Sequence, residues 1–211
     1  MCNWAHPSIT ISVCRETTSF TYPRPVRTKD LISQLKKEPN PLKSKMLLLR
    51  YVTDRLEKKS QSVVLVGGQA VETYTGGEFT TGDIDITTSD KKTTEQILTS
   101  IGFQRIGMIW LNEQIGIAIH IVGMFPRNLA KTRTIEVGPY DVRLVGVEDL
   151  IIDRLAAAKV WNRPSDIEQA KILFANFKKQ LDMDYLTKRA SDEHVLEVLD
   201  QAKQTETHSS T

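Results

Sequence analysis

The sequence predicts an α+β fold: a mixed, twisted sheet flanked by helices, followed by a helical carboxy-terminal part. Two observations lead to this prediction. Up to about residue 145, short apolar runs with the two-residue period of strands lie among a few helical segments, separated by glycine, asparagine or proline. From residue 147 onward the period lengthens to that of helices.

Each element of the first part is predicted from its local pattern. The second of two early helices carries an apolar stripe with lysine and arginine opposite, and the lysine-rich stretch 36–45 is expected to be a solvated face. A β-branched run ends at Gly67-Gly68, a short helix follows, and Gly76-Gly77 breaks that helix. The predicted helices are Asp30–Lys37, Lys43–Lys59, Gln69–Tyr74 and Lys92–Ile101. The predicted strands are Ile9–Val13, Ser62–Val66, Asp83–Thr88, Phe103–Ile106, Met108–Leu111, Ile115–Val122, Thr132–Val137 and Asp141–Val145.

The second part of the chain is predicted to be helical throughout. Its helices are Val147–Val160, Ser165–Phe177, Asp182–Arg189 and Asp192–Lys203. The predicted organisation is a loosely ordered arm over residues 1–27, an α/β core over 28–146, a helical part over 147–204 and a disordered tail over 205–211. The arm is rich in Pro, Thr, Ser and Arg without a clear period, and the tail is polar.

Composition and charge exclude some classes of protein. The chain has 211 residues, of which 40% are hydrophobic and 26% charged, as in ordinary globular proteins. A net charge of only +2 gives little support for nucleic-acid binding by bulk charge. No stretch approaches the roughly 20 apolar residues of a membrane span, and residues 1–12 make a poor signal peptide. Cys2 and Cys14 fit free thiols, so we predict a cytoplasmic protein with no membrane partner.

The most informative segment is the strand that ends at Gly67-Gly68, followed after fourteen residues by Asp83-Ile84-Asp85. Strand residues two apart point to the same face, so Asp83 and Asp85 are expected to project side by side. Two carboxylates that close together repel each other unless a cation lies between them. Magnesium suits them, because it takes oxygen ligands and bridges to substrate phosphates. The pattern therefore predicts an Mg²⁺ site on Asp83 and Asp85.

The two glycines are expected to form a phosphate cradle. Without Cβ atoms, Gly67 and Gly68 allow the backbone to approach a ligand closely, and the helix start after them supplies free N–H groups. Thr80 and Thr81 precede the aspartates and are candidates for hydrogen bonds to a phosphate, or else are simply turn residues. A lone Gly-Gly is usually a tight turn and a lone Asp-x-Asp is often a solvated edge. Together, in this order, they favour phosphoryl or nucleotidyl transfer.

This arrangement resembles the signature of the polymerase-beta nucleotidyltransferase superfamily, a Gly-Gly or Gly-Ser followed by Asp-x-Asp, with a spacing towards its long end. The run Val147–Ala157, then Arg163 and Asp166–Ala170, resembles prokaryotic members related to abortive-infection toxins. The resemblance covers roughly residues 45–177. It implies nucleotide-binding roles for Arg154 and Asp166. The structural alternative for Arg154 is an ion pair on a helix surface. For Asp166 it is the acid near a helix N-terminus, where it interacts favourably with the helix dipole.

Active members of that superfamily have a third acidic residue on a neighbouring strand, and the matching position here holds His120. His120 would be a general base, since its pKa suits proton removal near neutrality. It would less naturally be a metal ligand, because magnesium prefers oxygen. Alternatively the catalytic set is incomplete, or His120 is a strand histidine bonded to a neighbour. Glu113, in the preceding turn, is a weaker candidate for the missing acid.

The resemblance and the motif together imply magnesium-dependent transfer of a nucleotidyl group from a nucleoside triphosphate to an acceptor hydroxyl. The acceptor is left open among a tRNA or other RNA, a protein and a small molecule, because the fold does not choose among them. A toxin role would require a cognate antitoxin as partner. The alternatives are a catalytically incomplete nucleotide- or partner-binding protein on the same fold, and a plain interaction domain.

Overall fold

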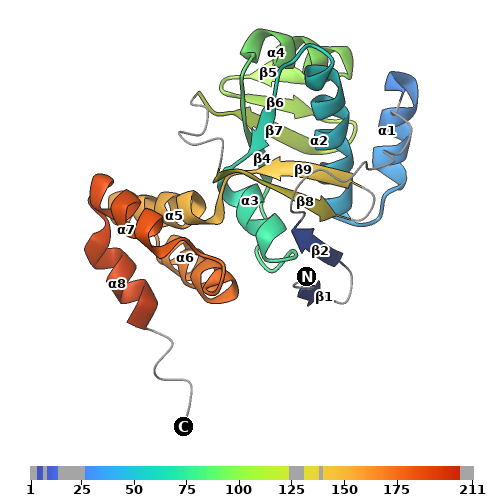
Figure 1. Cartoon of the computed structure of the whole chain (residues 1–211). Helices are drawn as coiled ribbons and strands as arrows, with labels where there is room; N and C mark the ends of the chain where they lie inside the picture. The colour runs from blue at the N-terminus through green and yellow to red at the C-terminus, as the bar shows by residue number, and fades with distance from the viewer. Residues whose placement is uncertain (1–3, 7–8, 14–26, 124–130, 138–139, 205–211) are drawn as a thin grey trace. The chain divides into compact units, whose positions relative to one another are not determined.

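The computed structural model describes residues 4–6, 9–13, 27–123, 131–137 and 140–204 (Figure 1). The chain divides into two compact units, Met1–Leu144 and Val145–Thr211. The first unit contains the sheet and the second is helical. The α+β fold predicted from the change of period is therefore confirmed. The predicted tail, 205–211, lies outside the described residues.

The described strands of the first unit form one nine-stranded sheet in the order β1-β2-β8-β9-β3-β4-β7-β6-β5. The strands are β1 (Trp4–His6), β2 (Ile9–Val13), β3 (Val63–Leu65), β4 (Asp83–Thr88), β5 (Gln104–Ile106), β6 (Ile109–Asn112), β7 (Ile117–Ile121), β8 (Arg133–Val137) and β9 (Tyr140–Leu144). The sheet is mixed, because β3 runs parallel to β9 and β4 parallel to β7, whereas the other neighbours are antiparallel.

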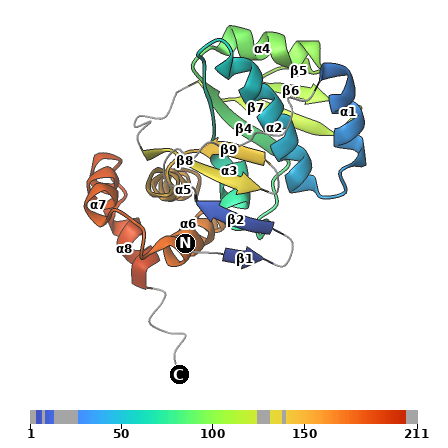
Figure 2. The same ribbon diagram turned by 45° about the vertical axis from the view of Figure 1, so that its right-hand side comes forward.

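The central strands build the core of the first unit. All three residues of β3 are buried, and Ile84, Ile86 and Ile119 are completely buried on β4 and β7. The helices described in this unit are α1 (Thr28–Lys37), α2 (Pro41–Glu57), α3 (Gly67–Tyr74) and α4 (Lys91–Ser100). Helix α2 packs against β3 and β9 and also contacts α1 and α4, whereas α3 contacts β4 (Figures 1 and 2).

Local signals explain where these helices begin. Asn40 caps α2 by accepting a hydrogen bond from the Lys43 N–H at 3.0 Å, and Pro41 occupies the first helical position. Asp90 caps α4 in the same way, accepting from the Thr93 N–H at 2.9 Å. After α4 the backbone turns at Gly102, with φ of +87°, as a glycine beyond a helix end commonly does.

The amino-terminal residues contribute to the sheet. Strand Ile9–Val13 was expected, and the structure pairs it with β8. Strand Trp4–His6 was not expected and pairs with β2. A three-residue strand without clear alternation gives no periodic signal in the sequence. The rest of the arm, 14–26, lies outside the described residues.

The second unit consists of α5 (Val147–Trp161), α6 (Pro164–Phe177), α7 (Met183–Asp192) and α8 (Leu196–Gln204). Helix α5 contacts the other three, and its Leu150, Ile151 and Leu155 are completely buried. The last helix begins at Leu196 instead of the predicted Asp192, because α7 continues to Asp192 and the chain then turns through His194 with φ of +58°.

None of the helices that the structure describes combines the length and apolar character needed to cross a membrane.

Candidate active site

The strand β3 leads directly into helix α3 through the two glycines. Gly67 has φ of +64°, a left-handed conformation that side chains with a Cβ rarely adopt. The predicted helix began at Gln69, but the observed helix begins at Gly67, so both glycines lie in its first turn. The N–H groups of the helix start, and its partial positive charge, are therefore at the glycines themselves.

There is no room for a side chain at either glycine. A Cβ on Gly67 would lie 2.8 Å from Cγ of Asp85 and would collide with its carboxylate oxygen. A Cβ on Gly68 would lie 2.8 Å from Cγ2 of Thr81. The glycine turn, Gly67-Gly68, is thus packed directly against the segment that carries the aspartates, as the sequence motif predicted.

Asp83 and Asp85 lie on β4 and alternate with the buried Ile84 and Ile86. Their side chains therefore share the face of the strand that is not occupied by the two isoleucines, and both are partly exposed. The backbone N–H of Val66, just before the glycines, donates to the carbonyl oxygen of Asp85 at 2.9 Å. The structure therefore brings the Asp85 carboxylate to the glycine turn, with Asp83 two residues earlier on the same face of β4.

His120 stands beside Asp85 on the neighbouring parallel strand β7, where the two residues are register partners. Its Nδ1 lies 3.2 Å from Oδ1 of Asp85. When Asp85 is ionised it can only accept, so Nδ1 carries the proton of this bond and Nε2 of a neutral ring has a free lone pair. Glu113, the weaker candidate for a third acid, is exposed. His120 therefore lies beside Asp85 on the neighbouring strand, and its correspondence to the missing carboxylate stays a prediction.

The surroundings of Asp85 disfavour its negative charge. Burial raises the pKa of the Asp85 carboxyl above its ordinary value, and the nearby charge of Asp83 raises it further. Hydrogen bonds from His120 and from the Gly68 N–H act in the opposite direction. Among the described residues, no lysine or arginine forms an ion pair with Asp83 or Asp85. The pair is therefore short of positive charge.

This arrangement fits a divalent cation that brings part of its own coordination shell. In the described part of the chain, no three His, Cys, Asp or Glu side chains are grouped so that they could hold a metal ion by themselves. Magnesium does not require such a cage, because it is usually held by one or two carboxylates together with water and substrate phosphates. Asp83 and Asp85 are the residues that would hold it.

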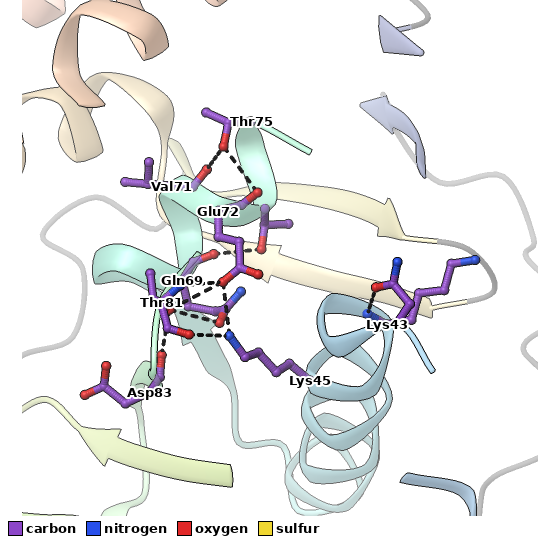
Figure 3. Close-up of polar contacts among 10 residues, drawn as sticks. Lys43, Lys45, Gln69, Val71, Glu72, Thr75, Thr81 and Asp83 are labelled. Atoms are coloured by element: carbon purple, nitrogen blue, oxygen red, sulfur yellow. Dashed lines mark hydrogen bonds and ion pairs between the residues drawn. The ribbon is translucent and has the colours of Figure 1, made fainter. Parts of the chain in front are cut away.

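The two threonines before β4 differ from each other. Thr80 is exposed, whereas Thr81 is bonded within the protein. The hydroxyl of Thr81 lies 3.2 Å from Oε1 of Gln69 and 3.0 Å from the carbonyl oxygen of Asp83. The backbone of Thr81 bonds to Lys45 and Glu72, two buried residues that the sequence analysis did not assign to the site (Figure 3).

Lys45 corrects the expectation that the stretch 36–45 is a solvated face, because its exposed fraction is only 9%. A signal for this was present in the sequence. Lys45 lies three residues after Leu42 and four before Leu49, both buried, and residues at these helical spacings share a face. Glu72 likewise lies on the buried side of α3, with an exposed fraction of 3%.

Arg154 and Asp166 belong to the second unit, where they lie against each other. Nη1 of Arg154 is 3.4 Å from Oδ1 of Asp166, with side-chain exposures of 19% and 8%. Within the described residues, Nε of Arg154 and Oδ2 of Asp166 are buried without a hydrogen-bond partner. The resemblance predicted nucleotide-binding roles for these residues, and those roles stay predictions.

The mixed sheet, the glycine turn and the Asp-x-Asp strand define a nucleotidyltransferase of the polymerase-beta-like superfamily. More narrowly, residues 42–209 match the family model described as "Nucleotidyltransferase of unknown function (DUF6036)", and the chain belongs to this family. No curated protein is significantly similar to it in sequence.

Solved structures of nucleotidyltransferases share the fold. ANT(2″)-Ia, crystallised in complex with adenylyl-2″-tobramycin, has a TM-score of 0.51 at 13% identity, covering 72% of this chain and 97% of its own. The solution structure of the antibiotic-resistance factor ANT(2″)-Ia has a TM-score of 0.50 at 14% identity, covering 76% of this chain and 97% of its own. An antigenic nucleotidyltransferase-like protein from Paracoccidioides brasiliensis has a TM-score of 0.50 at 12% identity, covering 74% of this chain and 90% of its own. At such identities the similarity establishes the fold alone.

Proposed function

We propose that this protein transfers a nucleotidyl group from a nucleoside triphosphate to a hydroxyl group of an acceptor, with magnesium held by Asp83 and Asp85. The observation that supports the proposal is the close approach of the Asp85 carboxylate to Gly67, with Asp83 on the same face of β4. An anion cradle and a cation holder thus meet at one end of β3 and β4, and transfer of a nucleotidyl group requires both.

The chain's own groups have distinct roles in this proposal. The N–H groups in the first turn of α3 that do not face the Asp85 carboxylate bind phosphate oxygens, and the missing side chains of Gly67 and Gly68 let the phosphates approach. Asp83 and Asp85 hold the divalent cation, which when bound neutralises the triphosphate. The acceptor hydroxyl attacks the α-phosphorus, the bond to the pyrophosphate breaks, and the hydroxyl loses its proton.

His120 is the group placed to accept that proton. Its Nδ1 is bonded to Asp85, which leaves Nε2 as the basic atom of the neutral ring. A second candidate function rests on the same residue. If the family's third acid is needed for turnover, a histidine in its place gives a protein that binds nucleotide and releases it unchanged.

The primary experiment offers labelled ATP, GTP, CTP or UTP with Mg²⁺ to the purified protein, together with total tRNA, a protein extract or a small hydroxylated molecule. Tobramycin belongs among the small molecules, because the ANT(2″)-Ia structure contains its adenylylated form. Transfer of label should disappear in Asp83→Ala and in Asp85→Ala. It should persist in Asp141→Ala, an acid at the start of β9 that pairs with Arg50. Transfer by the Asp83→Ala/Asp85→Ala double variant would refute the assigned metal site.

A substitution of His120 separates the two candidate functions. If the protein is a nucleotidyltransferase with His120 as the proton acceptor, His120→Asp and His120→Ala both lower the rate of label transfer. If the protein binds nucleotide without turning it over, the wild type shows Mg²⁺-dependent nucleotide binding in a thermal-shift assay but no label transfer. In that case His120→Asp raises turnover. A protein that shows neither binding nor transfer would contradict both candidates and favour an interaction domain.

A further inference from the structure

A buried ion pair lies under the glycine turn. Nζ of Lys45, on α2, is 3.0 Å from Oε2 of Glu72, on α3, and their side-chain exposures are 11% and 4%. The same Nζ donates to the carbonyl oxygen of Thr81 at 2.8 Å. Figure 3 shows Lys45 reaching from its helix to Glu72 and Thr81. The ion pair therefore connects two helices with the segment that precedes β4.

Thr81 is held at several atoms. Its N–H donates to Oε2 of Glu72 at 3.1 Å, and its carbonyl oxygen accepts from Lys45. Its hydroxyl lies 3.0 Å from the Asp83 carbonyl oxygen and 3.2 Å from Oε1 of Gln69, while its methyl group packs against Gly68. Movement of Thr81 would therefore change the spacing between the glycine turn and Asp83.

A buried ion pair is a poor way to gain stability. Desolvation of the two charges offsets much of their attraction, and well-packed apolar residues often replace such a pair without loss of stability. The Lys45–Glu72 pair does something that apolar residues would not do, because it supplies the donor and the acceptor for both backbone groups of Thr81. Its geometry fits the role of holding the parts of the site in register.

We propose that Lys45 and Glu72 are positioning residues that clamp Thr81 and thereby hold the Gly67-Gly68 turn against the strand carrying Asp83 and Asp85. Neither residue contacts the reacting atoms in this proposal. The consequence for nucleotide binding rests on the proposed function, whereas the effect on the local structure does not. The two can therefore be tested separately.

The most informative variant is the double substitution Lys45→Met/Glu72→Leu. It removes both charges together, so that no buried charge is left unpaired, but it also removes the partners of the Thr81 backbone. The matched control is Arg50→Met/Asp54→Leu, which removes an ion pair from the same helix. Arg50 also pairs with Asp141, at the start of β9. The other end of β9 is the part that pairs with β3, through Leu144 and Leu65. Loss of the Arg50 contact is therefore not expected to disturb the end of β3 that leads into the glycine turn.

The first measurement is amide hydrogen exchange at Val66 without nucleotide or metal. The Val66 N–H donates to the carbonyl oxygen of Asp85 at 2.9 Å, so it reports the contact between the start of the glycine turn and β4. We expect exchange about tenfold faster or more in Lys45→Met/Glu72→Leu than in the control, at equal thermal stability. Unchanged exchange would overturn the proposal. If the double variant does not fold, the exchange rate is measured in the isosteric Glu72→Gln variant instead. There we expect a smaller increase in the exchange rate over the wild type.

The second measurement compares label transfer and binding of the four Mg²⁺-nucleoside triphosphates. We expect the apparent Kd to rise about tenfold or more, and kcat to fall, in Lys45→Met/Glu72→Leu but not in the control. Glu72→Gln, which keeps an oxygen for the Thr81 N–H, should recover part of the loss. Wild-type binding and kcat in a stable double variant would contradict the positioning role. If the wild type itself binds no triphosphate, the proposed function fails, and the exchange data still decide whether the clamp exists.

Discussion

Two aspartates of this protein, the buried Asp149 in α5 and the half-buried Asp85 in β4, have opposite surroundings. Asp149 accepts hydrogen bonds from the Tyr185 hydroxyl at 3.0 Å and from Nε of Arg189 at 3.0 Å. Asp85 is bonded to His120, and the like charge of Asp83 raises its pKa. One carboxylate is neutralised by the fold and the other is not.

The difference separates a structural carboxylate from one that we propose to be functional. A buried charge that is paired and hydrogen-bonded holds helices together, as Asp149 does between α5 and α7. A buried carboxylate beside another, without a cation of the protein's own, destabilises the fold and is retained where it binds something. The contrast leads to four predictions.

The largest effect is expected for Asp149→Asn. Loss of this charge leaves Arg189 with only part of its partners and should lower the free energy of unfolding by about 3 kcal/mol. Chemical denaturation measures the change. Label transfer at a temperature where the variant is folded should be close to wild type, and a loss of transfer by the folded variant would remove the distinction between the two aspartates.

Gly67→Ala should lower the free energy of unfolding by about 2 kcal/mol or more. Its left-handed conformation alone costs about 1–2 kcal/mol for a residue with a Cβ, and the new Cβ would collide with Asp85. The matched control is Gly123→Ala, where a Cβ would meet nothing within 4 Å. Denaturation midpoints of the two variants check this, and equal midpoints would contradict the close contact between turn and strand.

Mg²⁺ should stabilise the wild type, because it binds the carboxylate pair in the folded chain only. At a free concentration tenfold above its Kd the expected gain is about 1.4 kcal/mol. The gain should be absent in Asp83→Asn/Asp85→Asn and unchanged in Asp149→Asn. A thermal-shift titration with and without a nucleoside triphosphate measures it; equal shifts in all three proteins would argue against the site.

The smallest effect is expected for Asp85→Asn without divalent cations. This substitution should stabilise the folded protein, whereas Asp149→Asn should destabilise it. Because the pKa of Asp85 is raised in the folded state, the folded chain binds its proton more tightly than the unfolded chain does. Ionisation therefore destabilises the fold at pH values above the raised pKa, and this cost disappears as pH falls through it. Asp85→Asn should thus raise the melting temperature at neutral pH and lose that advantage in acid. A lower melting temperature at neutral pH would contradict the prediction.

The local patterns of the sequence determined most of the elements. Alternating residues over Asp83–Thr88 were sufficient to predict that Asp83 and Asp85 share one face of a strand. The α+β fold followed from the change of period at residue 147. Such features depend on neighbours in the chain, so a single sequence contains them.

The spacing of Lys45 in α2 carried a signal for its burial, but only the tertiary structure decided what the buried charged residues bond to. Lys45 and Glu72 are 27 residues apart, and their contact depends on how α2 and α3 pack, which no local pattern specifies. The same holds for Thr81, which was a candidate phosphate ligand and is bonded within the protein. The physical reason is that burial makes an unpaired charge costly, so the partners of a buried residue are chosen by the whole fold and not by its sequence neighbours.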